Sequence, residues 1–395
     1  MMTFEGCPGF KMAGVACGLK KNNEKDLGLI YSEAPAKVAG VFTRNRIKAA
    51  PVLLDQERIQ CGACQAIIVN SGNANCCTGD QGMQDAIRMT QLAASELGIS
   101  EDLVMVASTG VIGQPLVMGK IEKAIADLIQ ALDFDGAANF AGAIMTTDTV
   151  PKIVTRNGEL DGKRFTITGV AKGAGMIRPD MATMLCFLMT DIKAPSEQLK
   201  QMLTAATDIS LNRMTIDGDT STNDTALLMA NGKSEAQILN ADHMAAFQSV
   251  LDDVLITLAR QLVQDGEGVT KLVEVVVKGA SSDADARQIV DTVAHSPLLK
   301  TAFYGEDANW GRIFMAVGRA GVPIEPNTID VYFDDVLMVQ DSLGCGDEAE
   351  KEATKVLKKS EFTVTIDLKM GNGSASMLTC DFSIDYVKIN ADYRS

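Results

Sequence analysis

The stretch Lys163–Ile192, KRFTITGVAKGAGMIRPDMATMLCFLMTDI, has the pattern of two strands joined by a glycine-rich turn. The turn begins at Lys172 and runs directly into an apolar strand that starts with Thr183. A threonine at this place is usually structural, because β-branched side chains fit the pleated surface of a sheet. The pattern therefore predicts a sheet here and leaves Thr183 as a residue whose role needs other support.

The rest of the chain contains separate runs of helical and of strand periodicity. Apolar residues recur at three- and four-residue intervals over residues 80–98, 119–133, 195–208, 235–264 and 345–358. Residues 362–370 alternate strictly, which predicts a half-buried antiparallel strand, and Gly371–Ser374 is a turn signal before a further strand over 377–389. Such runs without regular alternation predict an α+β fold, a layered sandwich of antiparallel or mixed sheets with helices.

The bulk composition limits the size, location and partners of the protein. At 395 residues the chain is long enough for two domains, which we expect at 1–190 and 191–395. A net charge of −15 would repel a phosphate polyanion, so nucleic acid is a poor partner. No segment approaches the roughly 20 apolar residues that span a bilayer, and no signal pattern opens the chain. We therefore expect a cytoplasmic protein with no membrane partner.

Metal and cofactor sites have little support in the sequence. Nine cysteines are scattered along the chain, and four of them cluster, namely Cys61, Cys64, Cys76 and Cys77. Adjacent cysteines without a nearby histidine are an unusual zinc-ligand pattern, so reduced thiols are favoured. The acidic stretch Asp217–Asp224 has Thr222 and Leu228 where a calcium loop has glycine and glutamate. The glycines after Lys172 lack the spacing of a dinucleotide-binding turn, so we expect no metal and no cofactor.

Histidine is scarce, since the chain holds only His243 and His295, and a nucleophile must therefore find another base. A threonine acquires a base when the peptide bond before it is cut. The new α-amino group, with an unperturbed pKa of about 7.7–8.0, can accept the proton of the hydroxyl. Thr183 is the candidate for this chemistry.

Residues 172–191 resemble the signature of the glutamate N-acetyltransferase and ornithine acetyltransferase family of arginine biosynthesis. Other blocks resemble those of the family in the same order: Val69–Asn75, Ser108–Gly113, Thr146–Thr149, Asp217–Asp224, Gly266–Gly268, Gly305–Arg312 and Asn390–Ser395. The resemblance covers essentially the whole chain. It implies the ornithine acetyltransferase (DmpA/ArgJ-like) fold.

The resemblance also implies an activity. The chain would cut itself between Ala182 and Thr183, giving chains 1–182 and 183–395, and two such pairs would form a heterotetramer. By a ping-pong mechanism, Thr183 would take acetyl from N-acetylornithine and pass it to glutamate. Whether acetyl-CoA also serves as donor, which would add amino-acid N-acetyltransferase activity, stays open at this point.

Roles for single residues follow from the same resemblance. Thr109 and Gly110 match the oxyanion hole, and the substrate contacts match Thr147, Lys172, Thr183, Glu267, Asn390 and Ser395. Lys172 is suited to a substrate carboxylate, and Glu267 is suited to the side-chain ammonium of ornithine. Two alternatives remain: an N-terminal-nucleophile amidase or aminopeptidase of the same fold, and an uncleaved, non-catalytic protein that binds a metabolite.

Overall fold

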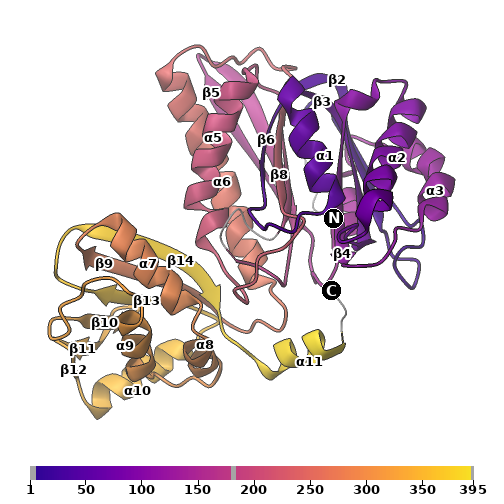
Figure 1. Ribbon diagram of the computed structural model, residues 1–395. Coiled ribbons are helices and arrows are strands. Elements are labelled where there is room, and N and C mark those ends of the chain that lie inside the picture. The colour runs from indigo at the N-terminus through magenta and orange to yellow at the C-terminus, as the bar shows by residue number, and fades with distance from the viewer. Residues whose placement is uncertain (1–5, 179–183, 393–395) are drawn as a thin grey trace. The chain divides into compact units, whose positions relative to one another are not determined.

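The computed structural model describes residues 6–178 and 184–392, which form two compact units (Figure 1). The first unit contains the chain up to residue 212 together with 219–262, and the second contains 213–218 and 263–394. The division expected after residue 190 falls inside the first unit, because the chain returns to the first sheet beyond that point. Ala182, Thr183 and Ser395 lie outside the described residues.

An eight-stranded mixed sheet forms the centre of the first unit. Its strands are β1 (Phe10–Val15), β2 (Leu27–Phe42), β3 (Ala63–Asn73), β4 (Val104–Val111), β5 (Lys152–Leu160), β6 (Lys163–Lys172), β7 (Leu185–Thr190) and β8 (Thr225–Ala230). Seven of them follow the order β4-β3-β2-β8-β7-β6-β5, and β1 pairs with β2. The pairs β3–β4 and β7–β8 are parallel, and the others are antiparallel.

Helices cover both faces of this sheet. They are α1 (Ala50–Arg58), α2 (Gly79–Leu97), α3 (Met118–Gln130), α4 (Ala137–Ile144), α5 (Ser196–Ile209) and α6 (Ala241–Gln264). On one face Phe140 of α4 meets Phe187 of β7 edge to face, with ring centroids 5.6 Å apart. On the other face the apolar sides of α2 and α3, which lie side by side in Figure 1, pack on Leu29 and Ile68. Burying these faces supplies most of the driving force for the layers.

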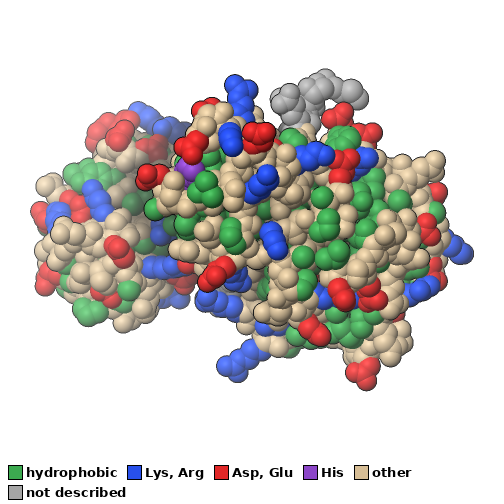
Figure 2. Space-filling view, turned by 90° about the horizontal axis from the view of Figure 1, so that it is seen from above, with side chains coloured by type: hydrophobic (Ala, Val, Ile, Leu, Met, Phe, Trp, Pro, Cys, Tyr) green, Lys and Arg blue, Asp and Glu red, His purple; other side chains and the backbone are tan. Residues whose placement is uncertain are grey.

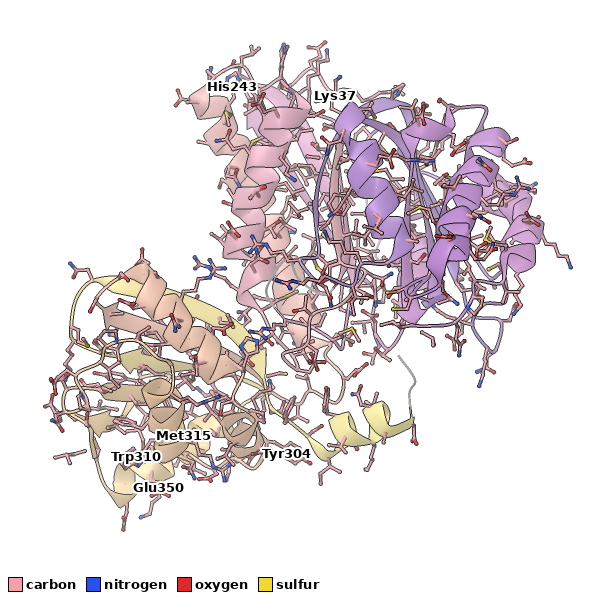
Figure 3. All side chains as sticks on the ribbon, viewed as in Figure 1. Lys37, His243, Tyr304, Trp310, Met315 and Glu350 are labelled. Carbon is pink, nitrogen blue, oxygen red and sulfur yellow. The ribbon has the colours of Figure 1, made fainter. Side chains whose placement is uncertain are left out.

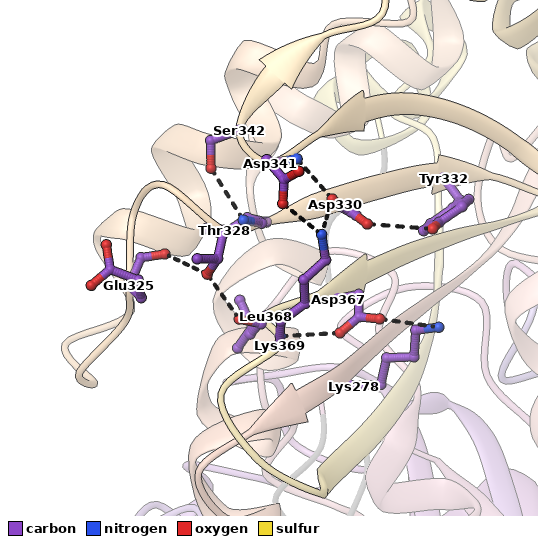
Figure 4. Close-up of polar contacts among 11 residues, drawn as sticks. Lys278, Glu325, Thr328, Asp330, Tyr332, Asp341, Ser342, Asp367, Leu368 and Lys369 are labelled. Atoms are coloured by element: carbon purple, nitrogen blue, oxygen red, sulfur yellow. Dashed lines mark hydrogen bonds and ion pairs between the residues drawn. The ribbon is translucent and has the colours of Figure 1, made fainter.

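The second unit has a six-stranded sheet in the order β12-β11-β10-β13-β9-β14. Its strands are β9 (Leu272–Ala280), β10 (Asp330–Phe333), β11 (Val336–Gln340), β12 (Leu343–Gly344), β13 (Glu361–Asp367) and β14 (Gly373–Cys380). Its helices are α7 (Asp283–Ala294), α8 (Pro297–Tyr304), α9 (Trp310–Gly318), α10 (Asp347–Leu357) and α11 (Ile384–Asp392). At one end of the sheet the ammonium of Lys369 lies 2.6 Å from Asp330 Oδ1 and 2.8 Å from Asp341 Oδ1 (Figure 4).

Most of the expected elements are confirmed, and the α+β class with mixed sheets is confirmed with them. The expected helix over 235–264 begins only at Ala241. β13 is half-buried as expected, but it runs parallel to β9 as well as antiparallel to β10. The strand expected over 377–389 is wrong in its second half, where α11 begins at Ile384. Ser383 accounts for this start, because its Oγ accepts a hydrogen bond from the amide of Tyr386 as an N-cap does.

Two surface properties bear on partners. On the face shown in Figure 2, acidic and basic side chains lie interspersed with apolar ones. Within residues 6–178 and 184–392, no helix combines the length and the hydropathy that a membrane crossing requires.

Candidate active site

Thr109 and Gly110, the residues matched to an oxyanion hole, lie in the last three residues of β4, and this end of the strand is called the oxyanion turn below. In register Thr109 lies opposite Ser71 and Gly110 opposite Gly72 on the parallel strand β3, where the pairing becomes irregular. Gly110 has φ of 132°, and a Cβ there would lie 2.4 Å from the carbonyl carbon of Gly72. Only glycine fits, so the backbone amide at this position is held at a close approach that no other residue allows.

Lys172 is the last residue of β6, and its ammonium reaches the same turn. Its Nζ donates to the Thr109 hydroxyl oxygen at 3.2 Å and to the Thr146 hydroxyl oxygen at 2.9 Å. The side chain is 8% exposed. A positive charge with little solvent around it therefore lies beside the two residues matched to an oxyanion hole, and a poorly solvated charge of this kind acts strongly on its neighbours.

The carboxylate of Asp148 carries the opposite charge and interacts with both Lys152 and Lys172. Its Oδ1 accepts from the Lys152 ammonium at 2.7 Å and from the Gly173 amide at 2.7 Å, and its Oδ2 accepts from the Thr146 amide at 3.1 Å. Burial raises the pKa of Asp148, but the Lys172 and Lys152 ammonium groups lower it by more than burial raises it, so that the pKa is about 2. Asp148 is therefore ionised at neutral pH. Thr147, half-buried, stands between Thr146 and Asp148 in the chain.

The chain that leads into β7 enters beside these groups. Leu185, the first residue of β7, is paired in register with Lys172 on one side and with Thr225 of β8 on the other. The Met184 carbonyl accepts from the Thr225 amide at 3.1 Å. Thr183, which precedes Met184 in the chain, lies outside the described residues; the described chain after it joins the sheet next to Lys172.

The residues just before β8 contact the strand end that carries Thr109 and Gly110. The Asn223 amide nitrogen donates to the Ala74 carbonyl at 2.6 Å and to the Ser108 carbonyl at 2.8 Å. The Thr222 hydroxyl donates to the Asn223 side-chain oxygen at 2.6 Å. Asn223 therefore links Ser108, which precedes Thr109, to the start of β8, the strand that pairs with β7.

Glu267 and Asn390 come together in the second unit. The Asn390 amide nitrogen, on α11, donates to Glu267 Oε2 at 2.7 Å, and Glu267 is buried. The neighbouring Gly268 has φ of +67°, and a Cβ there would lie 2.4 Å from the Tyr386 amide nitrogen. The C-terminal helix is thus held to the glycine turn instead of fraying, as its expected role in substrate binding requires.

The two histidines and the clustered cysteines have other contacts. His243 on α6 has Nε2 3.0 Å from Asp161 Oδ2, and Figure 3 shows it near the start of that helix. His295 belongs to the second unit, with Nδ1 2.6 Å from the Asp291 carbonyl oxygen. Cys76 and Cys77 have sulfurs 3.8 Å apart. Among the residues that the structure describes, no three histidine, cysteine or acidic side chains are grouped as metal ligands.

Comparison with known proteins identifies the family: the one described as ArgJ matches residues 11–395. The chain belongs to the ArgJ family. It is 53% identical to the arginine biosynthesis bifunctional protein ArgJ of Geobacter sulfurreducens, over 98% of this chain and 99% of that protein. The protein of the same name from Syntrophotalea carbinolica is 51% identical with the same coverage. This ArgJ-family chain is an enzyme, an acyltransferase of arginine biosynthesis.

A solved ArgJ structure supports the fold. The crystal structure of the arginine biosynthesis bifunctional protein from Bacillus halodurans matches with a TM-score of 0.51 and 41% identity, over 53% of this chain and 100% of that chain.

Several residues of the site were missed when the sequence was considered alone. Asp148 and Lys152 stand four residues apart, but periodicity does not show that both are buried. Asn223 and Asp224 belong to a stretch that resembles a family block and lacks the residues of a calcium loop, but the sequence assigns neither residue a role. Their role depends on contacts with β3, β4 and β7, which are distant in the chain.

Proposed function

We propose that this enzyme transfers acetyl from N-acetyl-L-ornithine to L-glutamate through an acetyl ester on Thr183, after self-cleavage at Ala182–Thr183. The observation that carries the proposal is the contact between Lys172 and Thr109, at the place where β7 enters the sheet. An oxyanion turn, a buried cation and the nucleophile segment are the groups that such an acyl transfer requires.

Each group has a step in the proposed reaction. The α-amino group of Thr183, present after the cut, takes the hydroxyl proton while the oxygen attacks the acetyl carbonyl. The Gly110 amide and the Thr109 hydroxyl hold the oxyanion, and Lys172 adds its positive charge. Ornithine leaves with the proton on its α-amine. The amine of glutamate then attacks the ester and regenerates Thr183, which makes the mechanism ping-pong.

Substrate binding is proposed for the residues that match the family's contacts. In the first unit these are Thr147, Lys172 and Thr183, of which Lys172 is suited to an α-carboxylate. In the second unit Glu267 presents a buried carboxylate that already accepts from Asn390, and we infer that it accepts the side-chain ammonium of ornithine. Ser395 completes the proposed set.

The chain architecture is part of the proposal. We infer fragments 1–182 and 183–395 that associate as a heterotetramer in the cytoplasm. In support, only 53% of this chain matches the whole Bacillus halodurans crystal chain, about the share that residues 183–395 make up. We also propose acetyl-CoA as a second donor to glutamate, since the curated relatives carry the word bifunctional in their names.

Mass spectrometry tests the proposal on purified protein. We expect two fragments, the second beginning Thr-Met-Leu-Cys-Phe, and an acetyl group on that fragment when N-acetylornithine is supplied without glutamate. Parallel initial-rate lines should accompany the trapped ester, and acetyl-CoA tested in place of N-acetylornithine shows whether it is a donor. An intact Ala182–Thr183 bond in fully active enzyme would overturn the mechanism. Rapid hydrolysis of the donor without any transfer to glutamate would instead favour an amidase.

A further inference from the structure

Self-cleavage needs a base that acyl transfer does not need. Before the cut, the nitrogen of Thr183 is an amide and cannot accept the hydroxyl proton. Both histidines have other partners, since His243 Nε2 lies 3.0 Å from Asp161 Oδ2 and His295 Nδ1 lies 2.6 Å from the Asp291 carbonyl oxygen. The base must therefore be sought among the acidic side chains that neighbour the nucleophile segment in the first unit.

Asp148 is poorly suited to this task. Its two oxygens accept from Lys152, Gly173 and Thr146, and its pKa is held at about 2 by the balance of burial against the two lysines. A carboxylate with so low a pKa takes a proton reluctantly, and no lone pair of Oδ1 is left without a donor.

Asp224 has the opposite properties. It immediately precedes β8, and Thr225, the next residue, donates its amide to the Met184 carbonyl. The Met184 backbone also acts on the Asp224 carboxyl, so this side chain lies beside the residue that follows Thr183. Asp224 is 3% exposed, and within the described part of the chain its Oδ2 has no hydrogen-bond partner.

The charge environment makes the Asp224 carboxyl a stronger base than an exposed one. Burial raises its pKa well above the usual value, and the Met184 backbone and the Lys172 ammonium offset only part of that effect. Lys172, on β6, is the charged group that acts on it, and hydrogen bonds with the side chains of Ser221 and Thr43 also lower its pKa. A buried polar atom left without a partner calls for an explanation, and proton transfer is one.

We propose that Asp224 carries the proton in the self-cleavage step, from the hydroxyl of Thr183 to the amide nitrogen of the same residue. The Thr183 oxygen forms a bond to the carbonyl carbon of Ala182, and its proton passes to the Asp224 carboxylate. The carbon–nitrogen bond then breaks while Asp224 returns the proton to the nitrogen. Water hydrolyses the resulting ester, which leaves the carboxylate of Ala182 and the free hydroxyl of Thr183. The inference rests on the proposed self-cleavage.

The chain offers a matched control in Asp55 on α1. Like Asp224 it is buried, burial raises its pKa well above the usual value, and its Oδ2 has no partner among the described residues. Its Oδ1 accepts from the Val106 amide at 3.0 Å, and neither Met184 nor Lys172 acts on it. Asp55→Asn therefore makes the same chemical change at equal burial, away from the nucleophile segment.

The experiment follows cleavage of the full chain after cell-free synthesis, with samples stopped in denaturant and separated on a gel. We expect Asp224→Asn to slow the cut by about 10²- to 10⁴-fold, the usual contribution of a general acid–base group, and Asp55→Asn to leave it unchanged. The wild-type rate should fall as the pH drops through the Asp224 pKa, and Asp224→Asn should lose this dependence. A structural role alone would not remove the pH dependence.

Three outcomes would overturn the inference. Cleavage of Asp224→Asn at the wild-type rate with an unchanged pH profile is the first, and equal slowing by Asp55→Asn is the second. The third is a wild-type rate that does not fall in acid, which decides the matter even where Asp224→Asn fails to fold. If the wild-type chain is never cut at Ala182–Thr183, the proposed function fails first, and the two failures are thereby distinguished.

Discussion

The Nζ atom of Lys172 lies 3.2 Å from the Oγ1 atom of Thr109, although 63 residues separate them in the chain. The contact joins the end of β6 to the end of β4. It orients the Thr109 hydroxyl, because the ammonium donates to its oxygen and leaves the hydroxyl proton to point elsewhere. In the proposed mechanism the oxyanion accepts a hydrogen bond from that hydroxyl, and it also lies in the field of the buried lysine.

Removing the charge of Lys172 should mainly slow the reaction. Lys172→Met keeps the length of the side chain and removes the ammonium, and we expect kcat to fall by about 10²- to 10³-fold, the usual loss for one oxyanion-stabilising group. The control is Lys37→Met, since Lys37 is an exposed lysine of β2 (Figure 3). Steady-state rates on cleaved protein provide the measurement, and equal rates for the two variants would contradict the role of Lys172.

Thr109→Ala should lower kcat by about 10²- to 10³-fold and change KM much less, because its hydroxyl acts on charge that exists fully only after attack. Thr109→Ser keeps the hydroxyl and should recover most of the rate. Both variants must first be shown to be cut, since an uncleaved chain would be inactive for another reason. If fully cut Thr109→Ala keeps kcat within about threefold, the Gly110 amide holds the oxyanion without the Thr109 side chain.

Gly110→Ala should destabilise the protein and abolish transfer. The left-handed backbone costs about 1–2 kcal/mol for a non-glycine residue, and the overlap with Gly72 adds to it. Gly119→Ala is the control, because a Cβ there meets nothing within 4 Å and the residue lies in α3. That change should stabilise the helix by about 0.5–1 kcal/mol. Thermal unfolding measures both, and an unchanged Tm for Gly110→Ala would contradict the packing described.

The Asp148 carboxylate should make the free energy of unfolding depend on pH. Its folded-state pKa of about 2 lies below the roughly 3.9 of an unfolded aspartate, so its contribution is present above pH ~4 and is lost as the pH falls through about 2. Asp148→Asn leaves the Lys152 ammonium buried without its carboxylate, which typically costs 3–5 kcal/mol. In urea unfolding, the gap between wild type and Asp148→Asn should be largest at neutral pH and shrink in acid. Asp253→Asn, at an exposed ion pair with Arg156, should change stability by about 1 kcal/mol at most.

Glu267→Gln should change KM for one of the two substrates much more than for the other. The amide can still accept from Asn390, but it no longer carries the charge proposed to bind the ornithine ammonium. A charge-assisted hydrogen bond contributes about 1.5–3 kcal/mol, so KM for N-acetylornithine should rise by about 10- to 100-fold. KM for glutamate, which has no such ammonium, should change far less. Glu350→Gln on the exposed face of α10 is the control (Figure 3), and equal effects on both substrates would count against this role.

The sequence was sufficient for features that depend on near neighbours. The two strands around the turn at Lys172 and the alternation of β13 were predictable, because burial on one face of a strand repeats every second residue. The resemblance to the family's sequence blocks indicated Thr109, Lys172 and Glu267 as site residues before their positions in space were considered. Local patterns failed at α11, where Ile384 and Val387 stay exposed and one capping serine decides the start of the helix.

Only the tertiary structure decided which of these residues meet and in what electrical state. Asn223 reaches Ser108 across 115 positions, and no periodicity carries such a contact. Asp148 and Asp224 are the same type of residue and both are buried, yet the pKa of Asp148 is lowered to about 2 and the pKa of Asp224 is raised. Burial raises the pKa of both, but Lys172 and Lys152 outweigh it at Asp148, whereas Lys172 and the hydrogen bonds at Asp224 offset only part of it. A pKa depends on the charges and donors within a few ångströms, and folding brings these together from distant parts of the chain.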